Sequence, residues 1–214
     1  MSFKYQKYKE ILDFISEKSQ KNVKVVAVSK NQTLESIKEA ISYNVNIFGE
    51  NRVQEAKNKF GEIKAKNQNI ELHLTGPLQT NKVKDALKLF DVFQTLDRKK
   101  LALEFLKYPE LTFKKKFFIQ INVGKEKNKS GVLPEDSESF IKYCKNDMKL
   151  PICGLMCIPP INEPPEKYFS FLSSVAKEHN IDDLSMGMSA DYKVGVLSGA
   201  TTIRVGTLLF GERE

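Results

Sequence analysis

The fold is decided by the stretch Phe117-Phe118-Ile119-Gln120-Ile121-Asn122-Val123. Its odd-numbered positions are all apolar, whereas the even-numbered ones include an amide at two of three places. Residues two apart share one face of a β-strand. The outward face of a barrel strand packs on helices and has to be apolar, so this pattern predicts a barrel strand that points polar groups inward.

Two other predicted strands repeat the alternation. Ile203 and Val205 oppose a polar set near the end of the chain, and Leu72 and Leu74 do the same earlier. The opposing residues are Thr202, Arg204 and Gly206 in the first case, and Glu71, His73 and Thr75 in the second. An interior that contains Lys30, His73, Asn122 and Arg204 predicts a ligand site where the strands end. A polar core whose hydrogen bonds are satisfied internally is the alternative.

Eight short apolar runs, separated by helical segments, are spaced as parallel β/α units require. They begin near Val23, Val45, Ile70, Asp91, Phe117, Ile152, Asp183 and Thr202. We therefore predict an α/β fold, a single (β/α)8 TIM-type barrel, with an open doubly wound sheet as the alternative. Residues 1–214 would form one domain, with the barrel at 23–214.

An amphipathic helix is predicted within residues 1–20, with Tyr5, Tyr8, Ile11, Leu12 and Ile15 on one face. No eighth outer helix is expected after the last strand, so this helix should cover the seam left there. Thr33 is expected to cap a helix that starts at Leu34. Pro134 with two acids after it should open a helix over 137–144.

Charge and composition limit the functional classes. The net charge of +7 invites nucleic-acid binding, but only Arg52, Arg98, Arg204 and Arg213 are arginines, the residue on which base recognition depends most. We expect no nucleic-acid partner and a solvated lysine-rich surface instead. No apolar run is long enough to cross a bilayer and no signal-type segment begins the chain, so a cytoplasmic protein without a membrane partner is predicted.

The sequence offers few residues that could bind a metal ion or form a hydrolase active site. The chain has two histidines, far apart in sequence, and three cysteines without Cys-x-x-Cys spacing. We expect no metal site and buried thiols in a reducing compartment. A Ser/His hydrolase is disfavoured for the same reason.

Lys30 ends the first strand with the parity of Val26 and Val28, which places its amine over the mouth of the barrel. A neutral lysine amine there can condense with an aldehyde to a Schiff base, although a lysine at a strand end whose amine reaches solvent is the simpler interpretation. Ser185–Ser189 and Arg204–Thr207, which contain glycine and hydroxyl groups, close strands seven and eight. Barrels of this type often bind phosphate at those two loops, and simple turn glycines are the alternative.

At this point the residues resemble the YggS/PROSC family of pyridoxal 5′-phosphate (PLP)-binding homeostasis proteins, nearly end to end. The resemblance is carried by Val26–Lys30, Phe48–Asn51, His73–Gln79 with Asn81 and Lys82, Ile119–Asn122 with Lys129–Gly131, Gly154–Met156, Ser185–Asp191, Arg204–Thr207 and Phe210–Arg213.

The resemblance implies a barrel like the N-terminal domain of alanine racemase, with the cofactor PLP linked to Lys30. It also implies that Arg204 faces the pyridine nitrogen and that Asn51 and His73 lie near the rim or wall of the cofactor site. Phosphate contacts would come from Met188, Ser189, Gly206 and Thr207. An arginine disfavours protonation of the ring nitrogen, which weakens the ring as an electron sink.

Racemases of that type use a second base from a further domain of a partner subunit, and this chain is expected to end before such a domain. We therefore predict a PLP carrier, buffer or regulator that is not a robust enzyme and acts as a monomer. PLP-dependent apoenzymes are candidate recipients. A PLP-dependent amino-acid racemase with weak or narrow activity is the alternative.

Overall fold

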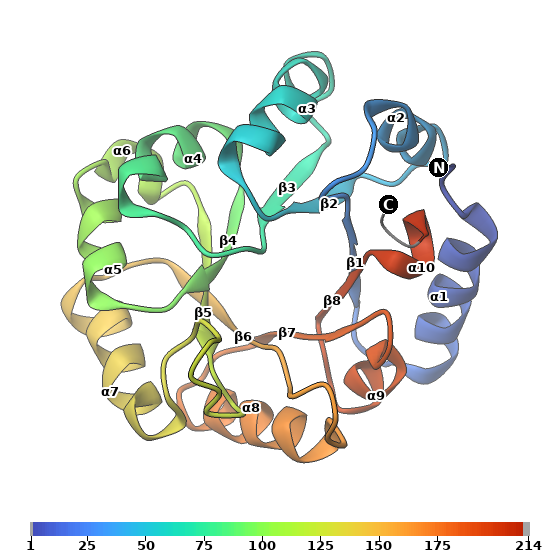
Figure 1. Ribbon diagram of the computed structural model, residues 1–214. Coiled ribbons are helices and arrows are strands. Elements are labelled where there is room, and N and C mark those ends of the chain that lie inside the picture. Colours follow the sequence, from blue (N-terminus) through green and yellow to red (C-terminus); the bar gives the residue numbers. More distant parts are fainter. Residues whose placement is uncertain (1, 212–214) are drawn as a thin grey trace.

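The computed structural model describes residues 2–211 and shows a closed parallel barrel with strands in sequential order from β1 to β8. Figure 1 looks along the barrel, with helices around its outside. Each strand begins within two residues of the predicted position. The strands are β1 Lys24–Val28, β2 Ile47–Glu50, β3 Glu71–Leu74, β4 Val92–Leu96, β5 Lys116–Ile121, β6 Ile152–Cys157, β7 Asp183–Met188 and β8 Thr202–Val205.

Helices cover the outside of the barrel, and short helical turns link several of them. The α-helices are α1 Tyr5–Lys18, α2 Leu34–Ser42, α3 Val53–Lys66, α4 Val83–Leu89, α5 Lys99–Leu106, α6 Pro109–Thr112, α7 Ser137–Lys142, α8 Glu166–Glu178, α9 Tyr192–Leu197 and α10 Thr207–Phe210. The 3₁₀ turns are η1 Thr80–Lys82 and η2 Pro134–Asp136, and the π-helical turn η3 spans Tyr143–Asp147. Among the described helices none is both long and apolar enough to cross a bilayer.

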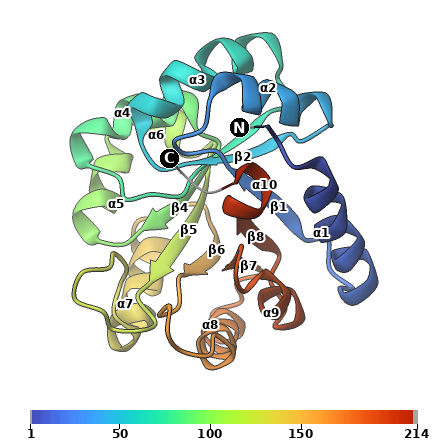
Figure 2. The ribbon, with the colours of Figure 1, turned by 45° about the vertical axis from the view of Figure 1, so that its right-hand side comes forward.

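Helix α1 covers the seam between β8 and β1, as predicted. It packs against α9 and α10, and Figures 1 and 2 show it beside α10 at the outside of β1 and β8. The Phe3 amide donates to Glu39 of α2 at 2.7 Å and the Lys4 amide to Leu209 of α10 at 2.8 Å, so the segment before α1 bridges both sides of the seam. Ile11 and Ile15 are buried, whereas Leu12 is 40% exposed.

The helix starts predicted at Thr33 and Pro134 are present in the structure. The Thr33 hydroxyl accepts from the Ser36 amide and caps α2. Pro134 opens the turn η2, which leads into α7 and then into the π-helical turn. Part of the stretch Phe210–Arg213, including Arg213, lies outside the described residues.

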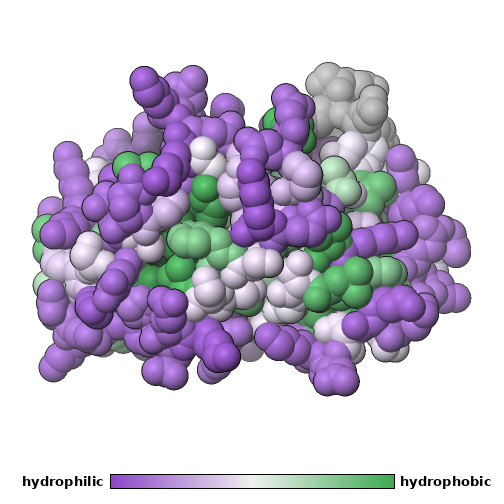
Figure 3. All heavy atoms as spheres, turned by 90° about the horizontal axis from the view of Figure 1, so that it is seen from below, coloured by the Kyte–Doolittle hydropathy of each residue, from purple (hydrophilic) through white to green (hydrophobic). Residues whose placement is uncertain are grey.

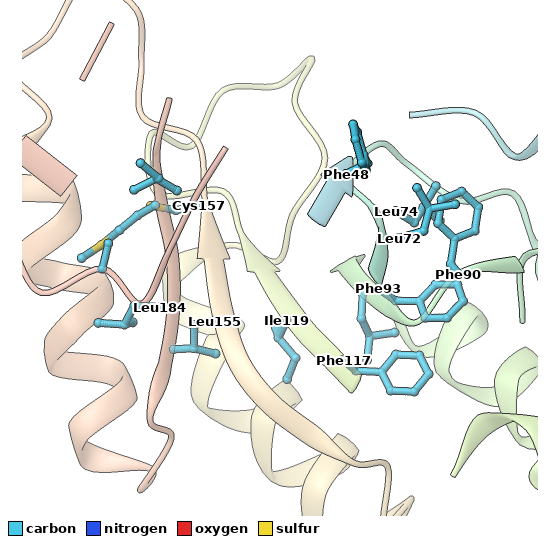
Figure 4. Packing of buried hydrophobic residues seen from close by; sticks show 14 of the residues in the cluster. Phe48, Leu72, Leu74, Phe90, Phe93, Phe117, Ile119, Leu155, Cys157 and Leu184 are labelled. Atoms are coloured by element: carbon cyan, nitrogen blue, oxygen red, sulfur yellow. The ribbon is translucent and has the colours of Figure 1, made fainter. Parts of the chain in front are cut away.

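The main hydrophobic core lies between the outer face of the strands and the helices. Figure 4 shows part of it, and Phe93 of β4 stacks on Phe117 of β5 there, with ring centroids 5.2 Å apart. The outward faces of β3, β5 and β8 contribute the apolar residues that alternation predicted. Figure 3 shows that the side seen from below is mostly hydrophilic at the surface.

A separate small apolar cluster of Val92, Phe118 and Met156 fills one side of the barrel interior. Gly154 of β6 lies directly beside it. A Cβ at this glycine would lie 2.2 Å from the Phe118 ring, so the phenyl group fits only because the side chain is missing. The rest of the interior near β3, β7 and β8 is polar and leads to the site.

Candidate functional site

Lys30 follows β1 after a single intervening residue and is partly buried at the mouth of the barrel. Val26 and Val28 share one face of β1, because a Cβ on Gly49 of β2 would lie 2.8 Å and 3.4 Å from their side chains. Lys30 lines a cavity of about 210 Å³ together with Asn51. Lys30 and Asn51, both predicted for the site, therefore lie together.

An outer ion cluster, made of Ser29, Glu50, Glu55 and Lys59, holds the backbone on both sides of Lys30. The Lys59 amine lies 2.7 Å from the Glu50 carboxylate and 2.8 Å from that of Glu55, and it donates to the Ser29 carbonyl at 2.7 Å. The Ser29 hydroxyl donates to Glu50 at 2.6 Å. Glu55 accepts from the amide of Asn31 at 2.5 Å, so residues 29 and 31 are both held.

Burial and hydrogen bonds act in opposite directions on the pKa of the two carboxyl groups of this cluster, and the balance differs between them. Glu50 is fully buried, and this burial raises its pKa, although Lys59 and Ser29 oppose the rise. Burial also acts to raise the pKa of Glu55, but hydrogen bonds from Lys59 and the Asn31 amide outweigh it and the pKa is lowered. Oε2 of Glu50 is buried and has no hydrogen-bond partner among residues 2–211. Lys59 is therefore the main compensation for the Glu50 charge.

The loops after β7 and β8 meet at Ser189. Its hydroxyl oxygen accepts from the amides of Gly206 at 3.3 Å and Leu208 at 3.5 Å. The Met188 amide is directed to Asp191 at 2.6 Å, and Thr207 begins α10. A Cβ on Gly206 would lie 3.2 Å from the Val28 carbonyl, so this turn passes close to the end of the strand that carries Lys30.

Arg204 points into the barrel from β8 and is 5% exposed. Its guanidinium donates to the Ser185 hydroxyl at 2.7 Å and to the Cys157 carbonyl at 2.8 Å. Both acceptors are neutral, and among the described residues no carboxylate forms an ion pair with it. Burial lowers the pKa of Arg204. A buried cation held by neutral acceptors favours a further acceptor or anion beside it.

An inner polar chain of Ser185, Gln94, His73, Glu71 and Lys24 continues from Arg204 through the interior. The Ser185 hydroxyl lies 2.6 Å from Gln94 Oε1, and Gln94 Nε2 lies 2.7 Å from His73 Nδ1. His73 Nε2 is 2.8 Å from Glu71, which also binds the Lys24 amine at 2.9 Å. Lys24 starts β1, so the chain ends about 20 Å along the strand direction from Lys30.

His73 therefore lies deeper in the molecule than the sequence suggested. Both ring nitrogens are engaged, and the residue lines a cavity of about 50 Å³ with Lys24 and Lys116. Burial lowers the pKa of His73 against the opposing effect of Glu71. The hydrogen bond from His73 lowers the pKa of Glu71 to about 2, with a further contribution from Lys24. A direct contact between His73 and a cofactor stays a prediction, and hydrogen bonds through Gln94 and Ser185 connect His73 to Arg204.

Asn51 belongs to the rim of the mouth. It lines three adjoining cavities of about 600, 240 and 210 Å³, and its side-chain oxygen accepts from Thr75 at 2.9 Å. Asn122, predicted to point inward, lines the second cavity and binds the loop that follows it through Glu126 and Lys129. Asn122 therefore shapes the mouth by fixing that loop.

The three cysteines are free thiols, and burial raises the pKa of each to about 12. Within residues 2–211, no group of three potential ligands is arranged to hold a metal ion.

Sequence reasoning missed the supporting role of four residues, Gln94, Ser185, Glu50 and Lys59, although Ser185 and Glu50 lie in stretches that carry the family resemblance. Strand parity could have found the first two, because a glutamine and a serine at inward positions of buried strands need partners inside the barrel. Nothing in the spacing of Glu50 and Lys59 indicates that a strand and the following helix bring them together behind Lys30.

The chain matches the family described as alanine racemase, N-terminal domain, over residues 5–214. It is 39% identical over 204 residues to the pyridoxal phosphate homeostasis protein of Aquifex aeolicus, covering 89% of this chain and 87% of that protein. The protein of the same name from Haemophilus influenzae is 37% identical over 209 residues, covering 92% of this chain and 88% of that protein.

Solved structures are similar to this chain as well. PipY of Synechococcus elongatus with PLP bound is 32% identical, with a TM-score of 0.79, over 94% of this chain and 99% of that chain. Alanine racemase of Clostridium difficile, at 17% identity and a TM-score of 0.73, shares the fold over 94% of this chain and 55% of its own. The chain therefore belongs to the alanine racemase N-terminal domain family and, within it, to the pyridoxal phosphate homeostasis proteins.

Proposed function

We propose that this protein binds PLP through a Schiff base with Lys30 and keeps the cofactor available in the cell as a carrier, buffer or regulator. The observation that carries the proposal is the common location of three parts of the site. Lys30, the Ser189 loop and Arg204 belong to or follow β1, β7 and β8, which are neighbours in the barrel. The PLP-bound relative supports the same ligand.

The chemistry of these groups fits PLP. Two amides converge on the Ser189 hydroxyl beside the glycine turn, and backbone amides and hydroxyls are suitable donors for a phosphate. Met188 and Thr207 flank that position. Arg204 can only donate, so it suits an unprotonated ring nitrogen. Asn51 lies at the rim near Lys30.

The same geometry supports a role without robust catalysis. PLP, when bound, supplies an aldehyde for reversible attachment of an amine and a ring that can withdraw electrons. An arginine at the ring nitrogen keeps the ring a weak electron sink. All seven tyrosines lie on helices or helix caps outside the barrel, and none lines the mouth cavities as the structure describes them. A tyrosine acting as a second base would therefore have no place at the mouth.

The test is mass spectrometry after PLP addition and borohydride reduction. We expect one PLP adduct on Lys30 and none in Lys30→Ala, with Lys142→Ala, an exposed lysine of α7, as the matched control. An unmodified Lys30 in the presence of excess PLP would refute the attachment. Lys30-dependent racemisation of an amino acid at enzymatic rates would favour the racemase alternative.

The remaining features of this proposal concern partners and location. We infer that the chain acts as one monomeric domain in the cytoplasm, that apoenzymes receive its PLP, and that nucleic acid is not a partner. Light scattering tests whether the protein is a monomer. Salt-dependent binding of a nucleic-acid probe would contradict the inference that nucleic acid is not a partner. Reactivation of a PLP-dependent apoenzyme by the loaded protein, with Lys30→Ala as control, tests delivery.

A further inference from the structure

The hydrogen bonds of the inner polar chain all run in the same donor-to-acceptor direction, which starts at Arg204. A guanidinium only donates hydrogen bonds, so the Ser185 oxygen accepts from Arg204 at 2.7 Å and the Ser185 hydrogen goes to Gln94 Oε1 at 2.6 Å. This fixes the Gln94 amide, whose nitrogen faces His73 Nδ1 at 2.7 Å. Amide nitrogens only donate, so Nδ1 accepts and the proton of the neutral ring is on Nε2.

Glu71, at the amino-terminal end of β3, is the last acceptor of the inner polar chain. Its carboxylate accepts from His73 Nε2 at 2.8 Å and from the Lys24 amine at 2.9 Å. Each link between Arg204 and Glu71 then pairs one donor with one acceptor. Ser185, Gln94 and His73 each accept a hydrogen bond on the Arg204 side and donate one on the Glu71 side.

We propose that Gln94 and His73 are positioning residues for Arg204, which orient the Ser185 oxygen toward the guanidinium and thereby hold it where it faces the ring of the bound cofactor. The last part of this statement rests on the proposed function. The first part concerns the protein alone.

The alternative is that these residues merely fill the interior. Hydrocarbon would serve for filling, and directly beside the chain Val92, Phe118 and Met156 do so, with Val92 and Phe118 lining the same small cavity as His73. The polar residues instead form one continuous line to Arg204, where each buried group would lose free energy if its partner were removed. The interior thus contains an apolar cluster and, next to it, a hydrogen-bonded chain that leads to Arg204.

A second proton on His73 would disturb this arrangement. It would place an N–H of Nδ1 against the Gln94 amino group, so the amide would have to rotate and the Ser185 hydrogen would lose its acceptor. The charged groups around His73 are Glu71 and Asp91, Lys24, and the Lys116 and Asp183 side chains that line the same cavity. Burial outweighs Glu71 and lowers the pKa of His73, in agreement with a neutral ring.

Nitrogen-15 NMR of the histidine rings in the unliganded protein tests the assignment directly. The chain has only two histidines, so His179→Gln identifies the His73 signals. We expect the neutral Nε2–H form in the wild type. In Gln94→Glu the carboxylate cannot donate to Nδ1, and we expect His73 to take a second proton. An Nδ1–H form in the wild type, or an unchanged ring in Gln94→Glu, would overturn the proposal.

The effect on Arg204 is measured by hydrogen exchange of its guanidinium, with Arg204→Lys identifying the signals. In Gln94→Leu we expect these protons to exchange about tenfold faster, because the Ser185 hydroxyl is no longer held. Thr112→Val, which removes a buried hydroxyl that bonds to Phe105 outside the barrel interior, should leave them unchanged. Equal exchange in wild type and Gln94→Leu would refute the positioning role.

PLP itself provides the last measurement. The visible band of the PLP-loaded protein should titrate at a different pH in Gln94→Leu than in wild type and Thr112→Val. An identical pH profile would refute the link to the cofactor. If no borohydride-stable adduct forms on Lys30 in the wild type, the proposed function fails, whereas the two NMR measurements still decide whether Gln94 and His73 hold Arg204.

Discussion

The residues at the mouth of the barrel are supported in two different ways, from outside at Lys30 and from inside at Arg204. Behind Lys30, the outer ion cluster combines two carboxylates with one buried amine. Behind Arg204, the inner polar chain uses neutral groups and reaches a carboxylate only at Glu71. A cluster of charges fixes a backbone segment strongly but fails when one charge is lost. A chain of neutral hydrogen-bonding groups orients a side chain, and the loss of any one hydrogen bond in it releases that side chain.

The outer cluster should give the largest effect when its cation is removed. Lys59→Met leaves the buried Glu50 carboxylate without its main compensation, and we expect a loss of about 3–5 kcal/mol in the free energy of unfolding. Urea unfolding measures this. Lys66→Met, in an exposed pair with Glu62, is the control. The double variant Lys59→Met/Glu50→Gln should recover part of the loss, and a double variant as unstable as the single one would argue against the charge as the cause.

The inner chain can be weakened at its far end by acid. The folded pKa of Glu71 is about 2, below its unfolded value of about 4.3. Its contribution is therefore complete above the unfolded pKa and is lost as the pH falls toward 2. With a discount for a side chain that is 27% exposed, we expect on the order of 2 kcal/mol over this range. Glu71→Gln should flatten this pH dependence, while Glu62→Gln should not; equal slopes would contradict the assignment.

A smaller change tests the Ser29 hydrogen bond without removing any charge of the outer ion cluster. Ser29→Ala removes the hydroxyl that donates to Glu50 but keeps Lys59 in place. We expect a loss of about 1–2 kcal/mol in thermal or urea unfolding and slower PLP attachment at Lys30. The exposed Ser139→Ala variant, which loses a bond within a single helical turn, should change stability less. If the two were equal, Ser29 would not be part of the support.

Thr33→Ala tests the helix that follows Lys30. Its hydroxyl caps α2 by accepting from the Ser36 amide at 3.2 Å, and the variant should lose about 1 kcal/mol. Ser42→Ala at the other end of α2 is the matched control. Because Thr33 is not in the outer ion cluster, PLP attachment should stay near the wild-type rate. A slower rate would extend the support of Lys30 to the start of α2.

Most of the fold was accessible from sequence because two local rules agree with it. Alternating strand residues identified the inward and outward faces, as at Phe117 and Gln120, and the spacing of the runs gave the parallel order. Lys30 and the Ser189 loop were placed at one end for the same reason, whereas Asn51 was placed there by the family resemblance. His73 and Asn122 were given the right direction but not their partners, because a strand pattern defines a face and not a depth. The Glu50 and Lys59 contact depends on how α3 packs, which no local pattern contains.

The raised pKa of the three thiols has a practical consequence for spectroscopy. With each pKa near 12, only a minute fraction of these cysteines is thiolate at neutral pH, and the thiolate is the form that reacts with maleimides. A single cysteine introduced on an exposed helix, for example at Lys142 of α7, should therefore carry a fluorophore without removal of the native cysteines. A dye placed there would report energy transfer to the PLP chromophore and follow cofactor delivery in real time.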